Sequence, residues 1–354
     1  MLELIFYIKG AKMSYSYSDL YKFARDGNVE MVKSLIDEGV DVNVQTQSGE
    51  TPLLVAVNKD RVEVVKALLT SDKIDVNLQD NSKWAPLHLA CLKGFLHVVK
   101  ALLTSDKIDV NLQIFNGCTP LHIAIENNHS NVIKSLLNSN GIDVNLQDNS
   151  GKSPLHIAAG KADLRPIELI LNSNGIDVNL QDNSGKSPLH IAAGRQFADV
   201  VENLLNSNGI DVNLKDNDGK SPLHIAIENN HSNVIKSLLN SNGIDVNLQD
   251  NSGKSPLHIA AQEGLVDVVY ALLKSDKTDV SLQDNYGKTP LYYAVKNGHG
   301  SSIGLLLIEA NKSKDGVDGN DIDLEEKGWH AEYHQNTDTE LTIMGKYIES
   351  EYLI

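Results

Sequence analysis

Six histidines recur at one fixed spacing, and imidazole nitrogens could ligate a metal ion or relay protons. Each lies 34 residues after the one before it. The six are His88, His122, His156, His190, His224 and His258. Zinc ligands must all lie about 2 Å from one ion, whereas helices in successive repeats pack roughly 10 Å apart. We therefore expect these histidines to be structural, and we expect no metal or cofactor.

Motifs for other chemistry are missing from the sequence. It contains no Gly-x-Ser-x-Gly, no glycine-rich phosphate loop and no His-Glu-x-x-His. The recurrent carboxylates, such as Asp143 and Asp177, stand in a repeated Asp-Val-Asn turn, where fixing a loop is the simpler role. The sequence predicts a protein that is not an enzyme.

Each of these six histidines belongs to a repeated block that opens with a variant of Thr-Pro-Leu-His. Ser153 is a good helix N-cap, and Pro154 suits the first helical position, where an N–H is not needed. The corresponding prolines are Pro86, Pro120, Pro154, Pro188, Pro222 and Pro256. A short helix is predicted to begin at each of them.

A second helix and an extended loop complete the block. Ile133, Leu136 and Leu137 form the apolar face of the predicted second helix. Between blocks, apolar and polar residues alternate over 144–147, and residues 149–151 supply turn chemistry. This pattern predicts a hairpin-like finger.

The N-capped Pro-Leu-His helix, the second helix with paired leucines, and the Gly-tipped turn resemble the ankyrin repeat family over residues 18–312. The resemblance implies an all-α solenoid of about nine helix-turn-helix units joined by hairpin-like β-turn fingers. It also implies that the histidine hydrogen-bonds the cap region and ties adjacent repeats. The departures from the pattern are Leu54 and Tyr292 at the histidine position, Ala85 at the cap, and Pro166 in a second helix, which we place in the first turn.

Three regions follow from this pattern: an N-terminal extension at 1–17, the repeats at 18–312 and an acidic tail at 313–354. From Asp315 onward there are 11 acidic residues and two lysines. The tail either folds back as a cap or is a free interaction segment. The net charge of −16 argues against a nucleic-acid partner.

The remaining composition points to a cytoplasmic monomer. Two cysteines, Cys91 and Cys118, have neither disulfide nor zinc spacing, so a reducing compartment is expected. We find no membrane-spanning stretch and no standard export signal, although a host-directed effector remains an alternative.

Large apolar residues interrupt two otherwise polar fingers. Trp84, Ile114 and Phe115 stand where other blocks carry polar or charged residues. Phe95 and Leu54 extend this candidate partner-binding surface, and Tyr286 is a second candidate. Local packing against neighbouring fingers is the alternative explanation for the first surface, and covering the outer face of the last repeat is the alternative for Tyr286.

The sequence therefore predicts a protein-protein interaction scaffold, acting as an adaptor or effector, that binds a partner protein through its fingers and inner helices. A passive spacer, with the acidic tail as the interaction segment, is the alternative.

Overall fold

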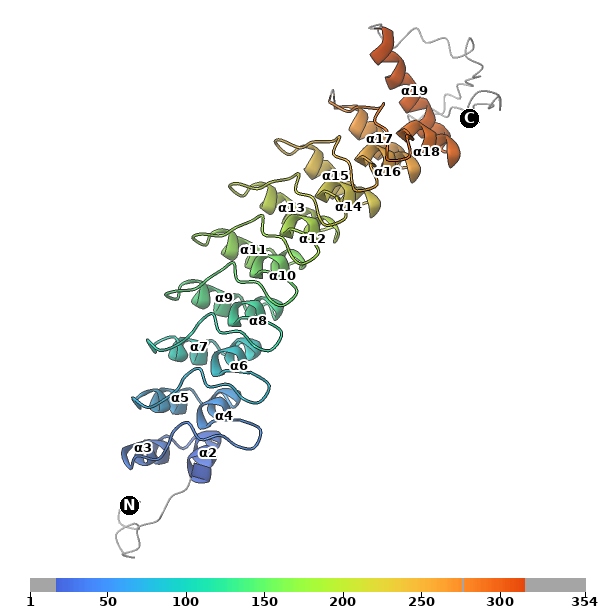
Figure 1. Cartoon of the computed structure of the whole chain (residues 1–354). Coiled ribbons are helices and arrows are strands. Elements are labelled where there is room, and N and C mark those ends of the chain that lie inside the picture. The colour runs from blue at the N-terminus through green and yellow to red at the C-terminus, as the bar shows by residue number, and fades with distance from the viewer. Residues whose placement is uncertain (1–16, 276, 316–354) are drawn as a thin grey trace, which may run out of the picture. The chain divides into compact units, whose positions relative to one another are not determined.

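The structure is a computed structural model that describes residues 17–275 and 277–315 of the 354. Every regular element in those two ranges is a helix, and the helices come in pairs along the chain (Figure 1). The all-α prediction is confirmed. The chain divides into two compact units, one of residues up to 158 with 168–176, the other of 159–167 with the residues from 177 onward.

Nine helix pairs lie between Tyr17 and Asp315 in the described ranges. The first unit contains α2 (Tyr17–Asp26), α3 (Val29–Asp37), α4 (Pro52–Asn58), α5 (Val62–Leu69), α6 (Pro86–Lys93), α7 (Leu96–Leu102), α8 (Pro120–Glu126) and α9 (Ser130–Leu137). Both units contribute residues to α10 (Pro154–Ala159) and α11 (Leu164–Leu171). The second unit contains α12 (Pro188–Ala193), α13 (Ala198–Leu205), α14 (Pro222–Glu228), α15 (Ser232–Leu239), α16 (Pro256–Gln262), α17 (Val266–Leu273), α18 (Pro290–Lys296) and α19 (Gly300–Asp315).

Each unit has two layers of helices. In the first unit, α2, α4, α6 and α8 pack successively on one another, and α3, α5, α7 and α9 do the same. In the second unit the two rows are α12, α14, α16, α18 and α13, α15, α17, α19. We call the first helix of each pair the inner helix and the second the outer helix.

The inner helices begin as the sequence predicts. At α8, Thr119 has extended backbone geometry and Pro120 is the first helical residue. The Thr119 N–H donates to Nδ1 of His122 (3.2 Å), and the Thr119 hydroxyl lies 2.8 Å from the same nitrogen. Since Nδ1 accepts from an N–H, the ring proton is on Nε2, which donates to the carbonyl of Lys152 (2.9 Å). The histidine thus fixes its own helix start and the next finger.

The outer helices bury one face. In α9 the side chains of Val132, Ile133 and Leu136 are buried, following the predicted spacing. Pro166 lies in the first turn of α11, where its missing N–H costs no helical bond, so this prediction is confirmed.

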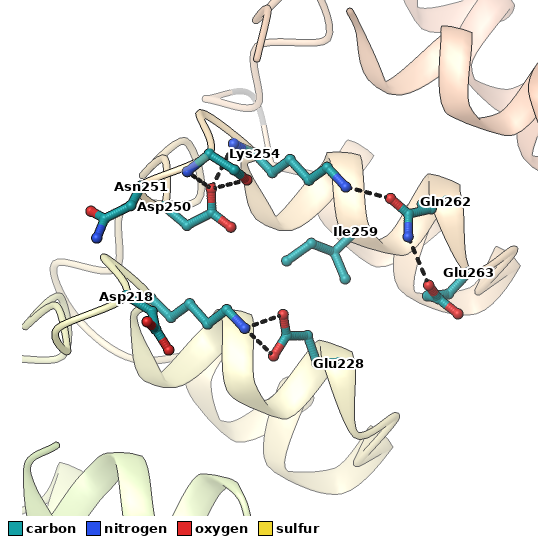
Figure 2. A pocket seen from close by; sticks show the side chains of 10 residues that line it. Asp218, Glu228, Asp250, Asn251, Lys254, Ile259, Gln262 and Glu263 are labelled. Atoms are coloured by element: carbon teal, nitrogen blue, oxygen red, sulfur yellow. Dashed lines mark hydrogen bonds and ion pairs between the residues drawn. The ribbon is translucent and has the colours of Figure 1, made fainter. Parts of the chain in front are cut away.

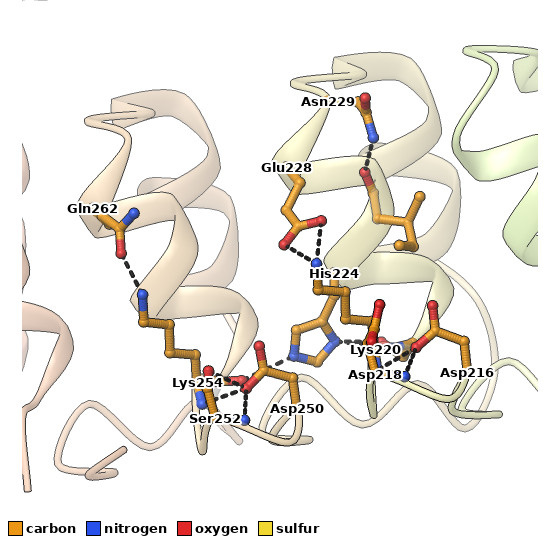
Figure 3. A network of polar contacts seen from close by, with 12 residues as sticks. Asp216, Asp218, Lys220, His224, Glu228, Asn229, Asp250, Ser252, Lys254 and Gln262 are labelled. Atoms are coloured by element: carbon orange, nitrogen blue, oxygen red, sulfur yellow. Dashed lines mark hydrogen bonds and ion pairs between the residues drawn. The ribbon is translucent and has the colours of Figure 1, made fainter. Parts of the chain in front are cut away.

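The fingers are closed turns rather than strands. In the finger of residues 216–220, the Asp216 N–H donates to the carbonyl of Lys220 (2.9 Å). The Asp216 carboxylate accepts the N–H groups of Asp218 (3.0 Å) and Lys220 (2.9 Å), as Figure 3 shows. The hairpin-like shape is therefore present, but no strand occurs in the described residues.

Neighbouring fingers are joined at their tips by two hydrogen bonds, which we call tip bonds. Asn251 donates its backbone N–H to the carbonyl of Asp218 (3.0 Å) and its Nδ2 to the carbonyl of Asn217 (2.9 Å). Asn285 makes the same two bonds to the finger before it. A row of asparagine and glutamine side chains joins successive loops below the tips, for example Gln249 Nε2 to the carbonyl of Gln283 (2.8 Å).

The domain boundaries at residues 18 and 312 stay predictions. Almost all of the predicted extension (1–17) and of the predicted tail (313–354) lies outside the described residues. No described helix combines the length and the apolar character needed to cross a bilayer.

Candidate functional site

The fingers at residues 80–84 and 114–118 form the most unusual surface of the first unit. Each keeps its own turn, closed by bonds from the Asp80 N–H to the Trp84 carbonyl and from the Ile114 N–H to the Cys118 carbonyl, both 3.0 Å. Phe115 takes the place of the tip asparagine, and neither tip bond from Phe115 to the finger at 80–84 is present. We call this pair of fingers the open tip.

A second substitution faces the first across the open tip. In other fingers, the residue before the last is a glycine, and a Cβ added at Gly49 would lie 2.6 Å from the N of Asn81 in the next finger. Lys83 occupies that position, with a positive φ of 66°. Because a side chain here prevents the close approach that tip bonds require, Lys83 and Phe115 explain the gap together.

A third substitution lies directly beneath the open tip. Ala85 caps α6 without a hydroxyl, and Nδ1 of the buried His88 has no hydrogen-bond partner. Its Nε2 donates to the carbonyl of Leu112 (2.8 Å), 24 residues on, whereas His122 reaches a carbonyl 30 residues on. Burial lowers the pKa of His88 to about 4, so the ring is neutral at pH 7.

The candidate residues differ sharply in exposure. Phe115 is 85% exposed, so most of an apolar aromatic side chain lies in water. Exposed apolar surface of this kind marks candidate interaction sites. Trp84 is half-buried and stands edge-on to His88, with 6.3 Å between ring centroids. Ile114 and Phe95 are half-buried, and Phe95 immediately precedes α7.

Leu54 is a correction to the sequence-based surface. It is only 2% exposed, because it lies in α4 at the position that buried histidines take in other repeats. A side chain there packs between inner helices and does not reach a partner. The alignment of Leu54 with His88 was the signal that could have predicted its burial.

The six motif histidines are structural wherever their contacts are described. The rings of His122, His190, His224 and His258 each use both nitrogens, Nδ1 at the cap and Nε2 on a carbonyl 30 residues on. Nδ1 of His156 lies 2.8 Å from the Ser153 hydroxyl. In the described residues, no three His, Cys, Asp or Glu side chains gather as a metal site would require.

The inner helices of the second unit carry a polar hollow of about 530 Å³ between two fingers. Figure 2 shows it beside the ion pair of Lys220 with Glu228 (2.8 Å) and the contact of Lys254 Nζ with Gln262 Oε1 (2.6 Å). In these two fingers the closing lysine thus contacts the residue eight positions later. This is a short-range pattern that the sequence analysis missed.

Farther along the second unit, the lysines meet tyrosines. Lys254 Nζ lies 4.6 Å from the ring centroid of Tyr293, and Lys288 Nζ lies 4.4 Å from that of Tyr292. The Tyr293 hydroxyl donates to Asp284 (2.6 Å), and burial together with this bond raises the pKa of Tyr293 to about 12. Tyr286 is 77% exposed, so it is accessible in this unit.

Comparison with known families identifies the repeats. The model of ankyrin repeats (3 copies) matches residues 20–114, 107–182, 155–250 and 242–318. The chain belongs to the ankyrin repeat family. Among solved structures, the ankyrin repeat domain of Bcl-3, described as a unique member of the IkappaB protein family, is 30% identical with a TM-score of 0.57. The match covers 62% of this chain and 96% of the Bcl-3 chain. A search of curated proteins gave no match.

Ankyrin repeats are generally non-catalytic domains that typically mediate protein-protein interactions. The predicted fold and family are thereby confirmed. The identity of the partner and the residues that bind it are matters for proposal.

Proposed function

We propose that this ankyrin repeat protein is a non-enzymatic scaffold that binds a partner protein through its fingers and inner helices, with Phe115 as the main anchor. The observation that carries the proposal is the exposure of Phe115, 85%, at a position where it makes neither tip bond. An asparagine side chain at that position would donate Nδ2 to the preceding finger, as Asn251 does, whereas the phenylalanine side chain has no donor and exposes apolar surface to water. A contribution to binding offsets both costs.

The neighbouring substitutions support the same site. Lys83 adds a side chain where other fingers have glycine, and it carries an exposed cation on the finger next to that of Phe115. Trp84 and Ile114 present partly exposed apolar surface on the same two fingers. Aromatic anchors surrounded by partly buried apolar residues are typical of interface hot spots.

The test is quantitative capture of proteins from a cell lysate by the full chain and by Phe115→Asn. Asparagine is the residue that six other fingers carry at the tip, so this variant removes the anchor while restoring the side-chain donor of a tip bond. We expect about thirtyfold loss or more of one captured protein, matching the roughly 2 kcal/mol or more of an interface hot spot.

The matched control is Tyr286→Asn, which removes a finger aromatic of similar exposure, 77%, from the second unit. It should leave capture of that protein unchanged. If Phe115→Asn captures every protein as well as the parent does, the anchor is wrong. If no protein is captured specifically by the parent, the spacer function is favoured instead.

A further inference from the structure

The ninth repeat exposes surface that the other repeats cover. Tyr292 is 38% exposed, whereas the equivalent residue one repeat earlier, His258, is fully buried. Leu291 and Val295 of α18 are half-buried, whereas Leu257 is 1% exposed and Ala261 fully buried. Among residues 17–275 and 277–315, therefore, no following repeat covers the face of α18 that points away from α16.

The finger at 283–288 opens the ninth repeat, and we call it the ninth finger. It also keeps two residues that serve a following finger elsewhere. Gln249 Nε2 donates to the carbonyl of Gln283 in the next finger (2.8 Å), and Gln283 repeats this residue type. A Cβ at Gly253 would lie 2.5 Å from the N of Asn285, which is the close approach of the next finger. A Cβ added at Gly287 would have as its nearest atom Oε1 of Gln283, 4.0 Å away in the same finger. With Gln283 and Gly287, the ninth finger therefore has the two residues that contact a following finger in other repeats.

The chain supplies a segment with the finger pattern just beyond α19. Residues 321–325 read Asp-Ile-Asp-Leu-Glu, against Asp-Val-Ser-Leu-Gln at 279–283 and Asp-Val-Asn-Leu-Gln at 143–147. Asp279 comes six residues after the end of α17 at Leu273, and Asp321 comes six residues after the end of α19 at Asp315. The motif falls outside the 34-residue register because α19 has 16 residues and α17 has 8.

Chain length permits this segment to return to the ninth finger. The eight extra helical residues of α19 add about 12 Å. The five residues 316–320 span up to about 17 Å when extended. Alternation over 321–325 then places Ile322 and Leu324 on one side of an extended chain and the carboxylates on the other.

The charges of the two surfaces are complementary. Lys296 is exposed at the position where Glu228 pairs with the finger lysine two repeats earlier, so the ninth repeat has two cations where the seventh has an ion pair. Neither Lys288 nor Lys296 has an ion-pair partner within the described ranges. The run of residues 316–326 carries five carboxylates and no cation.

We propose that residues 321–329 of this chain bind the uncovered face of the ninth repeat as a tenth finger, with Ile322 and Leu324 against Tyr292 and α18 and the carboxylates beside Lys288. Two links found in other repeats cannot form, because Tyr292 replaces the histidine and Ser281 replaces the asparagine. Apolar contact and charge therefore hold this finger, which makes its binding sensitive to salt.

The experiment uses the fluorescence of Trp329 in the full chain. The protein has two tryptophans, so Trp84→Phe leaves Trp329 as the sole reporter. We expect acrylamide to quench Trp329 at least threefold less in this protein than in a synthetic peptide of residues 316–334. Lys288→Glu with Lys296→Glu should raise quenching toward the peptide value, as should 1 M NaCl in the parent.

The matched control reverses two exposed lysines on outer helices of the first unit, Lys100→Glu with Lys134→Glu, and should leave quenching unchanged. Circular dichroism checks that each variant remains folded, and hydrogen exchange over 321–328 gives a second measurement that needs no variant. Quenching equal to the peptide's, exchange at the rate of an unstructured chain, or no response to the end-face variants overturns the proposal. No partner is present and Phe115 is intact, so the outcome is independent of the proposed function.

Discussion

The open tip of the first unit differs from the closed tips of the second at several residues, and three of them account for its missing bonds and its missing cap. Lys83, Ala85 and Phe115 stand where the second unit has glycine, a capping serine and asparagine. Below the open tip, Gln79 still donates to the carbonyl of Gln113 (3.1 Å) and Asn77 to that of Lys107 (2.8 Å). The lower links are sufficient to hold the fingers in register, so the tip residues can be replaced without loss of the fold.

Acid should weaken both regions, because burial lowers the pKa of His224 in the second unit and of His88 beneath the open tip to about 4. Burial lowers the pKa of His224 to about 4, against 6.5 for an ordinary histidine, so the unfolded chain binds more protons between those values. Stability is complete above pH 6.5 and falls as the pH drops toward 4, by about 3 kcal/mol for this residue. Urea denaturation at several pH values measures the loss. His224→Gln should have a shallower slope, and identical slopes would contradict the assignment.

Adding a Cβ at a closed tip should lower the stability of the protein, and removing one at the open tip should raise it. At Gly219 a Cβ would lie 2.6 Å from the N of Asn251, with φ at 76°, so Gly219→Ala should cost about 2 kcal/mol or more. Lys83→Gly, the reverse change at the open tip, should stabilise by about 1 kcal/mol. Chemical denaturation followed by circular dichroism compares the two. If Lys83→Gly lost as much stability as Gly219→Ala, the side chain of Lys83 would not be the cause of the open tip.

Restoring the missing cap should have an intermediate effect. Ala85→Ser places a hydroxyl beside the unpaired Nδ1 of His88 and caps α6, which should stabilise the protein by about 1 kcal/mol. Thermal melting measures the gain. Ala90→Ser, which puts a hydroxyl on the same helix at another buried position, is the control and should give no gain.

The smallest stability effect should come from the anchor itself. Phe115→Asn allows tip bonds to the finger at 80–84, but Lys83 still hinders the approach, so we expect a gain of at most about 0.5 kcal/mol. The double variant with Lys83→Gly should gain more than the sum of the two single changes. Strict additivity in a double-mutant cycle would show that the two residues do not act together.

The fold was largely predictable because its signals are local. The cap, the proline and the buried face of each helix lie within one block, so the sequence of residues such as Thr119, Pro120 and Leu136 identifies the helix pair without knowledge of its neighbours. The position of Pro166 in the first turn of α11 was predictable for the same reason.

The candidate site was only partly predictable. Sequence alone identified Phe115, Trp84 and Ile114 as departures from a polar pattern, but it also included Leu54, which is buried. The contacts of Lys254 with Tyr293 and Gln262 were missed, because they depend on which side chains the turns bring to one surface.

What the sequence determined by itself is the repeat, because caps and apolar periodicity act over a few residues and recur every 34. Only the tertiary structure decided that Phe115 is exposed and lacks tip bonds, that His88 has an unpaired nitrogen and that Tyr292 lies uncovered. Each of these properties depends on atoms contributed by the next or the preceding repeat, about 24 to 34 residues away, and distances of that kind are set by packing.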